Sequence, residues 1–368
     1  MSWEDRIGQR LDTIRRDGRW RSVRTLDRGT PAATVVGTGD QIVSFASNDY
    51  LGLSQHPAVV GAAREALDTW GAGAGAARLI VGSRPVHDEL ESDLAAWKGT
   101  DAAVLFPTGY QANLGVLGAL SSVAPGALIC SDELNHASII DGARLSRGEV
   151  VVYPHRDLGA LATMLESVGD RPAIVVSDSV FSMDGDLADV DGLAALCREH
   201  GALLVLDEAH AVLGPDSPAG AVIVGTLSKT LGAAGGFVAG SSDVVDLLRN
   251  TARSFIFTTA GTPADAAAAR AAVAIVRSPE GDELRRRLRA NIDRFRAGHS
   301  SPVIPVVVGD EDAAVALSDR LLSAGLLVPA IRPPTVAPGT SRLRIALSAM
   351  HDPIDIDRLS AALVEGGC

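Results

Sequence analysis

Lysine is almost absent from this sequence. Lys98 and Lys229 are the only lysines among 368 residues, and the other 31 of the 33 basic residues are arginine. Arginine serves for surface charge and ion pairs, but it cannot lose its proton and act as an amine nucleophile. Each lysine is therefore a candidate for covalent chemistry on a carbonyl group.

Cysteine and long apolar runs are also scarce. Cys130, Cys197 and Cys368 are odd in number and far apart, which fits neither a disulfide framework nor a zinc site. This usage predicts a reducing, cytoplasmic compartment. The sequence has no apolar run of 18 residues and begins with a polar, acidic segment, so we expect no transmembrane helix, no signal peptide and no bound metal.

The charge balance is acidic. The net charge is −12, although residues 1–28 form a predicted amphipathic helix and basic arm with eight arginines against five acidic residues. Most of these arginines suit a solvated helix face, and one or two are candidates for contact with an anionic substrate. Because the rest of the chain, after residue 28, is strongly acidic and has no basic tract, nucleic-acid binding is disfavoured.

The order of predicted elements indicates an α/β protein with a mainly parallel central sheet flanked by helices. Hydrophobic residues make up 46% of the chain, which is enough for a large core. Short β-branched runs alternate with helical patterns from residue 42 onward, as in parallel sheets covered on both faces. We predict an N-terminal helical arm (1–41), a large domain (42–280) and a smaller α+β domain (281–368).

Lys229 follows a predicted strand over residues 221–224, and Asp207 ends another over residues 202–206. Ligand chemistry in parallel sheets lies beyond the carboxyl ends of the strands, so one crevice receives both side chains. A lysine amine and a carboxylate suit pyridoxal 5′-phosphate (PLP): the amine forms a Schiff base, and the carboxylate keeps the pyridine nitrogen protonated. His210 comes three residues after Asp207. Taken singly, Asp207 is also a common helix cap, and His210 a common polar residue of a first turn.

A phosphate site is predicted where a helix begins at Gly109. Free backbone N–H groups and the helix dipole favour an anion there, and Thr226 and Ser228 offer hydroxyl groups from the lysine loop. An ordinary turn capped by Thr108 is the alternative. His136 lies on a loop after a strand, where an imidazole can stack on a flat ring or serve a purely structural role.

These residues belong to a series of motifs that resembles the α-oxoamine synthase family of fold-type I PLP enzymes over essentially the whole chain. The matching segments, in chain order, are residues 47–52, 71–78, Gly82, 87–90, 108–113, 135–138, 179–186, 207–210, 226–229 and 330–344. The resemblance implies the PLP-dependent transferase fold of type I, with a large PLP-binding domain and a smaller C-terminal domain.

The resemblance also implies roles for individual residues. Lys229 would hold the cofactor and take the α-proton, Asp207 would pair with the pyridine nitrogen, and His136 would stack on the ring. His210 and Ser182 would contact its phenolic oxygen side. The phosphate would be held by Gly109, Tyr110, Thr226 and, from a neighbouring subunit of a homodimer, Thr258 or Thr259. Asn48 and Arg344 would bind the amino-acid carboxylate, and Arg21 and Thr335 the acyl substrate.

The activity implied is condensation of L-alanine with a pimeloyl thioester, carried by CoA or an acyl carrier protein, with loss of carbon dioxide and the thiol. A sister reaction, such as that of glycine with acetyl-CoA, and a non-catalytic PLP-binding protein are the alternatives. One departure from the family pattern concerns residues 211–225, which are few and lack the customary Gly-Arg-Gly. This shortening affects the local loop but not the lysine or the aspartate.

Overall fold

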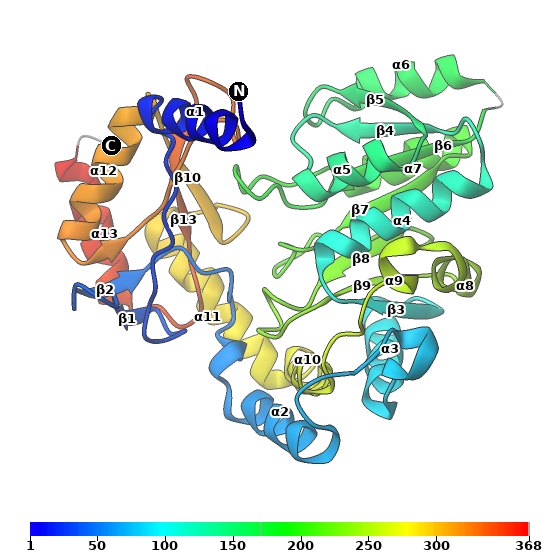
Figure 1. The fold of residues 1–368 in the computed structure, drawn as a ribbon, viewed down its shortest axis with the longest axis horizontal. Coiled ribbons are helices and arrows are strands. Elements are labelled where there is room, and N and C mark those ends of the chain that lie inside the picture. Colours follow the sequence, from blue (N-terminus) through cyan, green and yellow to red (C-terminus); the bar gives the residue numbers. More distant parts are fainter. Residues whose placement is uncertain (170, 367–368) are drawn as a thin grey trace. The chain divides into compact units, whose positions relative to one another are not determined.

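The computed structural model describes residues 1–169 and 171–366 (Figure 1). Cys368 lies outside the described residues. The helices are α1 (Trp3–Arg16), η1 (Leu53–Gln55), α2 (Pro57–Trp70), η2 (Arg78–Gly82), α3 (Pro85–Lys98), α4 (Gly109–Val123), α5 (Ala137–Leu145), α6 (Leu158–Val168), α7 (Val190–His200), α8 (Ser242–Thr251), α9 (Arg253–Ile256), α10 (Pro263–Val276), α11 (Pro279–Phe295), α12 (Glu311–Ser323) and α13 (Pro353–Glu365).

The strands form three sheets. They are β1 (Ala32–Thr34), β2 (Gln41–Ser44), β3 (Ala102–Phe106), β4 (Leu128–Asp132), β5 (Glu149–Tyr153), β6 (Ala173–Asp178), β7 (Leu203–Asp207), β8 (Val222–Thr226), β9 (Gly236–Gly240), β10 (Val303–Gly309), β11 (Leu326–Leu327), β12 (Ala330–Ile331) and β13 (Ser341–Ala346). The largest sheet has seven strands in the order β3-β9-β8-β7-β6-β4-β5. Its pairs from β8 to β5 are all parallel, and β9 is antiparallel to both of its neighbours, which confirms the predicted mainly parallel sheet.

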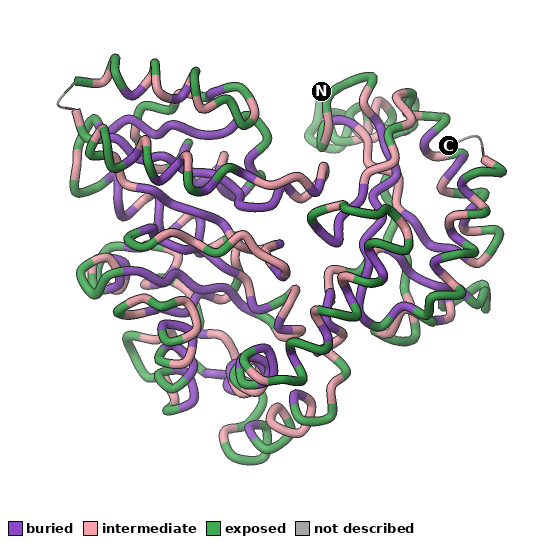
Figure 2. The backbone as a smooth tube through the Cα atoms, turned by 180° about the vertical axis from the view of Figure 1, so that it is seen from behind, coloured by how far each residue is buried: buried purple, intermediate pink, exposed green. Residues whose placement is uncertain are grey.

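Apolar side chains alternate across this sheet and build a core on each face. Val176 and Val205 pack with α4, α5, α8 and α9, whereas Val175 and Leu204 pack with α6 and α7. Successive strand residues point to opposite faces, so a sheet with helices on both sides needs nearly continuous apolar strands. Figure 2 shows these strands buried along most of their length, except the edge strand β5. The strands β6, β7 and β8 end in the polar residues Asp178, Asp207 and Thr226, so these side chains are held by a packed sheet.

The contacts divide the chain into two compact units. The first contains residues 1–46, 305–345 and the segment from 357 onward; the second contains residues 47–304 and 346–356. Two three-stranded sheets, β1-β2-β11 and β10-β13-β12, form the strands of the first unit, with β10 beginning two residues before it. Within this unit Arg19 pairs with Glu311 of α12 at 2.8 Å.

This division differs from the domain boundaries predicted at residues 41 and 280. Helix α11 belongs to the second unit, in which Asn291 donates to the carbonyl oxygens of Ser348 and His351 at 2.9 and 3.2 Å. Residues 1–46 share a unit with later segments because β2 pairs with β11. A division by chain order does not capture such pairings.

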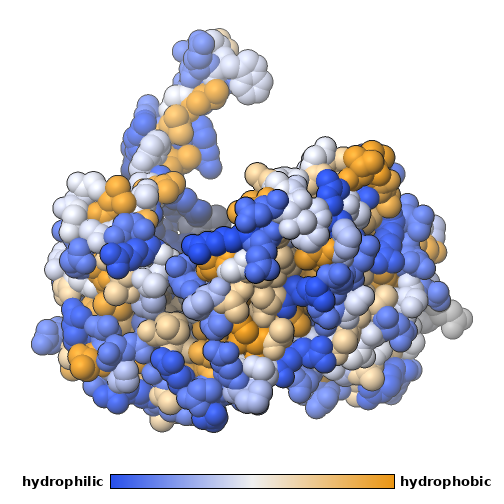
Figure 3. Space-filling model, turned by 90° about the horizontal axis from the view of Figure 1, so that it is seen from below, coloured by the Kyte–Doolittle hydropathy of each residue, from blue (hydrophilic) through white to orange (hydrophobic). Residues whose placement is uncertain are grey.

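No helix within the described ranges is long and apolar enough to cross a membrane. Hydrophilic and hydrophobic side chains are interspersed over the face drawn in Figure 3. Cys130 and Cys197 are buried and free, and burial raises the pKa of these thiols to about 11 and about 12. Both are therefore unreactive thiols within the core.

Candidate active site

Lys229 lies three residues beyond the carboxyl end of β8, in a turn closed by its own carbonyl oxygen, which accepts the N–H of Gly232 at 3.0 Å. Its Nζ lies 2.7 Å from Nε2 of His210. The other imidazole nitrogen, Nδ1, lies 2.5 Å from the hydroxyl of Tyr50, whose ring is fully buried. The chain Tyr50–His210–Lys229 therefore places a proton-accepting network directly at the lysine amine.

Asp207 ends β7, the strand next to β8, as the sequence predicts. Its carboxylate is buried and accepts two hydrogen bonds, from Asn113 Nδ2 at 2.7 Å and from the backbone N–H of Ala209 at 2.8 Å. Asn113 also donates to Ser138 Oγ at 2.9 Å. These bonds hold the Asp207 carboxylate in one orientation. A fixed orientation is what a carboxylate needs to bind a ring nitrogen.

A second carboxylate, Asp178, lies beside Asp207, because the two residues are paired in the register of β6 and β7. Burial, together with the charge of Asp207, raises the pKa of Asp178 well above its usual value. One Asp178 oxygen accepts the backbone N–H of His136 at 2.7 Å. The raised pKa favours the protonated, neutral form of Asp178 beside the Asp207 carboxylate.

His136 caps helix α5, where its Nδ1 accepts the N–H of Ser138 at 3.2 Å and lies 2.7 Å from the Ser138 hydroxyl. Burial lowers the pKa of His136; the charge of Asp207 opposes this shift and that of Lys229 reinforces it. A neutral imidazole is thus fixed by its own helix. Its ring lines the same cavity as Lys229 and Asp207.

The amino end of α4 lines this cavity of about 210 Å³. Thr108 caps the helix by accepting the N–H of Gln111 at 3.1 Å, which is the capped turn that the sequence offered as the alternative to a phosphate site. Within the described part of the chain, the N–H groups of Gly109 and Tyr110 have no hydrogen-bond acceptor. Thr226 and Ser228 add hydroxyls that lie 2.8 Å apart. Helix α4 can begin this close to β9 because Gly236 has no side chain. A Cβ at this position would lie 2.4 Å from the Gly109 nitrogen.

The cavity unites most of the predicted cofactor residues. Its lining includes Gly109, Tyr110, His136, Asp207, His210, Thr226, Ser228 and Lys229. Ser182 is half-buried on the loop after β6 and is not part of this lining. Thr258 accepts a hydrogen bond from Gln111 Nε2 at 3.4 Å, and Thr259 is exposed. Asn48 accepts a hydrogen bond from Tyr50 at 3.2 Å.

The remaining predicted substrate residues lie in the first unit. Arg21 and Thr335 line one open cleft of about 930 Å³, together with Arg10, Arg24 and Arg332. Arg344 lies on β13 and is buried, as is Arg342, whose Nε donates to the Thr340 carbonyl oxygen at 3.0 Å.

Four residues at this site were given no role by the sequence analysis: Tyr50, Asn113, Ser138 and Asp178. Each stands in or next to a motif, which was the available signal. Their function was hidden because it consists of tertiary hydrogen bonds, such as the one from Tyr50 to His210 across 160 residues of chain.

A charged network supports the loop after β6. The ring of His155 lies 2.9 Å from Asp132 and 2.8 Å from Asp186, and Arg156 pairs with Asp186 at 3.2 Å. Burial lowers the pKa of His155, but hydrogen bonds and charges from both aspartates outweigh it and raise the pKa to about 9. The imidazolium is therefore present at neutral pH.

We expect this network to make stability pH-dependent. The folded pKa of His155 is raised above the ordinary 6.5, so its stabilisation is complete below about pH 6.5 and is lost as the pH rises through about 9. The loss amounts to at most about 3 kcal/mol. The measurement is the free energy of unfolding between pH 6 and 10, for the wild type and for His155→Gln. Curves that differ by a constant amount over this range would contradict the assignment.

The comparisons with known proteins agree with this geometry. The chain matches the family described as aminotransferase class I and II over residues 40–363. It is 45% identical to 8-amino-7-oxononanoate synthase of Geobacter sulfurreducens, covering 98% of this chain and 97% of that protein. It is 46% identical to 8-amino-7-oxononanoate synthase of Burkholderia lata, covering 99% and 97%.

Solved structures give the same result. Serine palmitoyltransferase from S. paucimobilis with a bound PLP–myriocin aldimine superposes with a TM-score of 0.91 at 26% identity, covering 100% of this chain and 98% of that one. The crystal structure of 8-amino-7-oxononanoate synthase from Francisella tularensis has a TM-score of 0.73 at 25% identity, covering 88% and 97%. The chain belongs to the aminotransferase class I and II family and, within it, to the α-oxoamine synthases of PLP fold type I.

The residues present fit PLP. The two free amides of α4 and the hydroxyls of Thr226 and Ser228 suit its phosphate, and the Asp207 carboxylate suits its pyridine nitrogen. Asn113 Oδ1 is buried at the same cavity and, among the described residues, has no hydrogen-bond partner. In the described segments, no group of three or more His, Cys, Asp or Glu side chains is arranged to hold a metal ion.

Proposed function

We propose that this chain condenses L-alanine with a pimeloyl thioester to form 8-amino-7-oxononanoate, a step of biotin biosynthesis. The observation that carries the proposal is one cavity lined by Lys229, His210, Asp207 and His136, in a chain 45% identical to a synthase of that name over nearly its full length. The carboxylate of alanine leaves as carbon dioxide and the thioester sulfur leaves as a thiol, so the reaction needs no oxidant or reductant.

PLP supplies the electron sink that stabilises a carbanion at the amino-acid α-carbon. Lys229 attaches the cofactor and takes the α-proton. The contact between its amine and His210 helps the amine to hold that proton. Asp207 keeps the pyridine nitrogen protonated, and His136 stacks on the ring. His210 and Ser182 bind the phenolic oxygen side. The phosphate is bound by Gly109, Tyr110, Thr226 and Ser228.

The substrates are bound by residues outside this group. Asn48 and Arg344 hold the carboxylate of alanine, and Arg21 and Thr335 hold the acyl substrate. The arginine-lined cleft of the first unit supports the latter role, because cations concentrate an anionic ligand. We also propose a cytoplasmic location, which the two free buried cysteines suit.

The proposal is tested with a panel of amino acids and acyl thioesters, read by thiol release and product mass. Alanine with a pimeloyl thioester on CoA or on acyl carrier protein is expected to be the best pair. Preference for glycine with acetyl-CoA would assign the chain to a sister reaction. A colourless protein that releases no thiol from any donor would make it a non-catalytic member of the family.

The carboxylate assignment makes its own prediction. Arg344→Lys should lower kcat/KM for alanine by about ten- to a hundredfold, because an ammonium cannot replace a bidentate guanidinium worth about 1.5–3 kcal/mol. Arg342→Lys should have much less effect, since Arg342 binds a backbone carbonyl. Initial rates against alanine concentration decide this. Loss of bound PLP in Arg344→Lys, or equal effects of the two substitutions, would refute the placement.

We further propose a homodimer with shared active sites. Exposed apolar side chains support it: Leu79, Ile80 and Val81 of η2 and Phe257 are 54–74% exposed. The two segments are neighbours, because the N–H of Ala260 donates to the Ala76 carbonyl oxygen at 3.0 Å. An apolar surface of this kind is typical of a protein–protein interface.

Subunit mixing tests the sharing. If Thr259 reaches the partner's phosphate, Lys229→Ala and Thr259→Val proteins are each inactive, but a mixed dimer has one intact site. Random reassortment should then restore about a quarter of the wild-type activity. No recovery after confirmed exchange, or a fully active monomer in sedimentation, would exclude sharing through this residue.

A further inference from the structure

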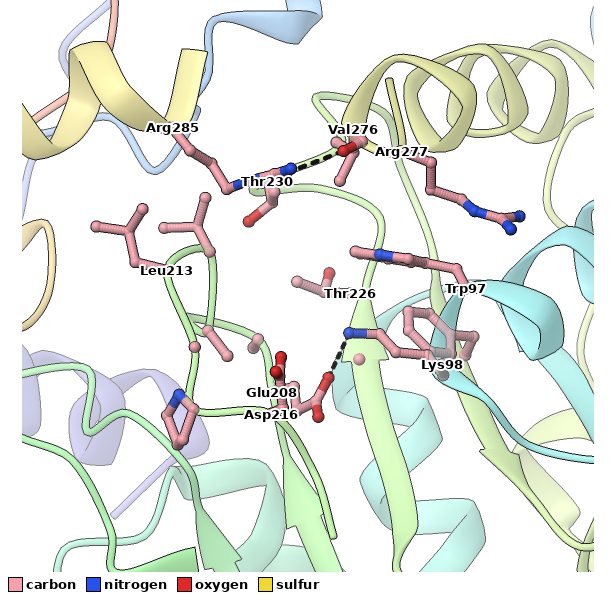
Figure 4. A pocket seen from close by; sticks show the side chains of 17 residues that line it. Trp97, Lys98, Glu208, Leu213, Asp216, Thr226, Thr230, Val276, Arg277 and Arg285 are labelled. Atoms are coloured by element: carbon pink, nitrogen blue, oxygen red, sulfur yellow. Dashed lines mark hydrogen bonds and ion pairs between the residues drawn. The ribbon is translucent and has the colours of Figure 1, made fainter. Parts of the chain in front are cut away.

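A second cavity, of about 700 Å³, adjoins the cofactor cavity, with which it shares Ala209, Gly225 and Thr226 in its lining (Figure 4). Its wall carries Lys98, the lysine for which the reaction has no covalent use. Figure 4 shows the Lys98 side chain extending from the end of α3 toward Glu208.

Lys98 and Glu208 form a sequestered ion pair. The Lys98 ammonium donates to one carboxylate oxygen of Glu208, and the Ser217 hydroxyl donates to the other. The side chains of Lys98 and Glu208 are only 15% and 4% exposed. Lys98 Nζ also lies 3.9 Å from the ring centroid of Trp97. Removing the lysine would therefore leave a buried carboxylate charge with only one hydroxyl as its partner.

Glu208 stands between two residues of the cofactor site. It follows Asp207 directly and precedes His210 by two positions. Adjacent residues of an extended chain point to opposite sides, and accordingly Asp207 lines the cofactor cavity while Glu208 lines its neighbour. The backbone of Glu208 donates to the Val224 carbonyl oxygen at 2.8 Å and accepts the N–H of Ala211 at 3.0 Å.

We propose that Lys98 and Glu208 are positioning residues that hold the turn 207–211, so that Asp207 and His210 keep their orientation toward the cofactor. Helix α3 thereby anchors the turn through one ion pair, and Ser217 ties the shortened loop to the same carboxylate. This role rests on the proposed function, because it acts through the cofactor residues and touches no reacting atom.

The first test compares Lys98→Met with Lys98→Arg. Lys98→Met should lower kcat by about ten- to a hundredfold, since small displacements of catalytic groups cost up to about that factor. KM for alanine should change less than about threefold. In the cofactor-free protein, amide hydrogen exchange at Ala209 and Ala211 should accelerate at least about tenfold, while exchange in the β6 core stays unchanged. Lys98→Arg keeps a cation and should recover most of both properties.

A double variant that removes both charges distinguishes the effect of an uncompensated charge from the simple loss of a contact. Lys98→Met combined with Glu208→Gln removes the uncompensated charge and should exchange more slowly at Ala209 than Lys98→Met alone. Arg270→Met is the matched control, because Arg270 pairs with Glu89 and Asp93 where all three side chains are 38–47% exposed. It should alter neither kcat nor exchange.

Exchange and kcat of Lys98→Met that equal those of Arg270→Met would overturn the inference. So would faster exchange spread evenly over the whole protein, which indicates global destabilisation. Exchange in the cofactor-free protein does not depend on the reaction. If the wild type proved inactive with every thioester while the turn responded as expected, the proposed function would fail, and the ion pair would be shown to hold the turn without a role in turnover.

Discussion

Lys229→Ala is expected to abolish the covalent link to PLP and to lower turnover by roughly 10⁴-fold or more, because general acid–base catalysis alone contributes up to about that factor. Lys229 supplies both the amine that attaches the cofactor and the base that removes the α-proton. The absorbance of bound PLP and thiol release measure the two losses separately. His210 lies 2.7 Å from this amine. Among the described residues that line the cavity, there is no second lysine that could replace Lys229.

Borohydride reduction followed by peptide mapping locates the attachment. The wild type should carry the pyridoxyl group on the peptide that contains Lys229 and none on the peptide that contains Lys98. Because these are the only lysines in the chain, two peptides decide the question. A pyridoxyl group on Lys98 would refute the assignment of the site.

Asp207→Asn should lower kcat by roughly 10²–10⁴-fold, since removing one partner of a buried charge pair costs about 3–5 kcal/mol. An amide cannot hold a proton on the pyridine nitrogen, so the electron sink is weakened. The side chain keeps its shape, and its remaining oxygen can still accept the hydrogen bond from Asn113 or Ala209. Bound cofactor should therefore remain detectable by absorbance, with an altered spectrum.

Asp178→Asn is the matched comparison. Burial and the neighbouring Asp207 raise the pKa of Asp178, so its carboxyl is protonated and an amide replaces one neutral group by another. We expect kcat to fall far less than in Asp207→Asn. Equal losses in the two variants would contradict the protonated state of Asp178.

Local sequence patterns were sufficient for several elements. Helix α4 begins at Gly109 as predicted, because the cap at Thr108 acts within one segment. The strands predicted over residues 202–206 and 221–224 correspond to β7 and β8 to within about two residues, because apolar β-branched runs also act locally. The sequence also predicted that Lys229 and Asp207 line one cavity, because adjacent parallel strands end at the same edge of the sheet.

Other features depend on contacts between distant segments. The unit boundaries follow from the pairing of β2 with β11 and from the hydrogen bonds of Asn291 in α11 to Ser348 and His351, neither of which has a local signal. The hydrogen bond from Tyr50 to His210 and the pairing of Asp178 with Asp207 arise from the three-dimensional arrangement alone.

The two lysines show where the division lies. By itself, the sequence determined that only Lys98 and Lys229 can act as amines, because amine chemistry is a property of the side chain. Only the tertiary structure decided what surrounds each of them. Lys229 lies at the cofactor cavity beside an imidazole, whereas Lys98 is paired with the buried carboxylate of Glu208. The reactivity of an amine depends on the charges and burial around it, and chain folding sets both.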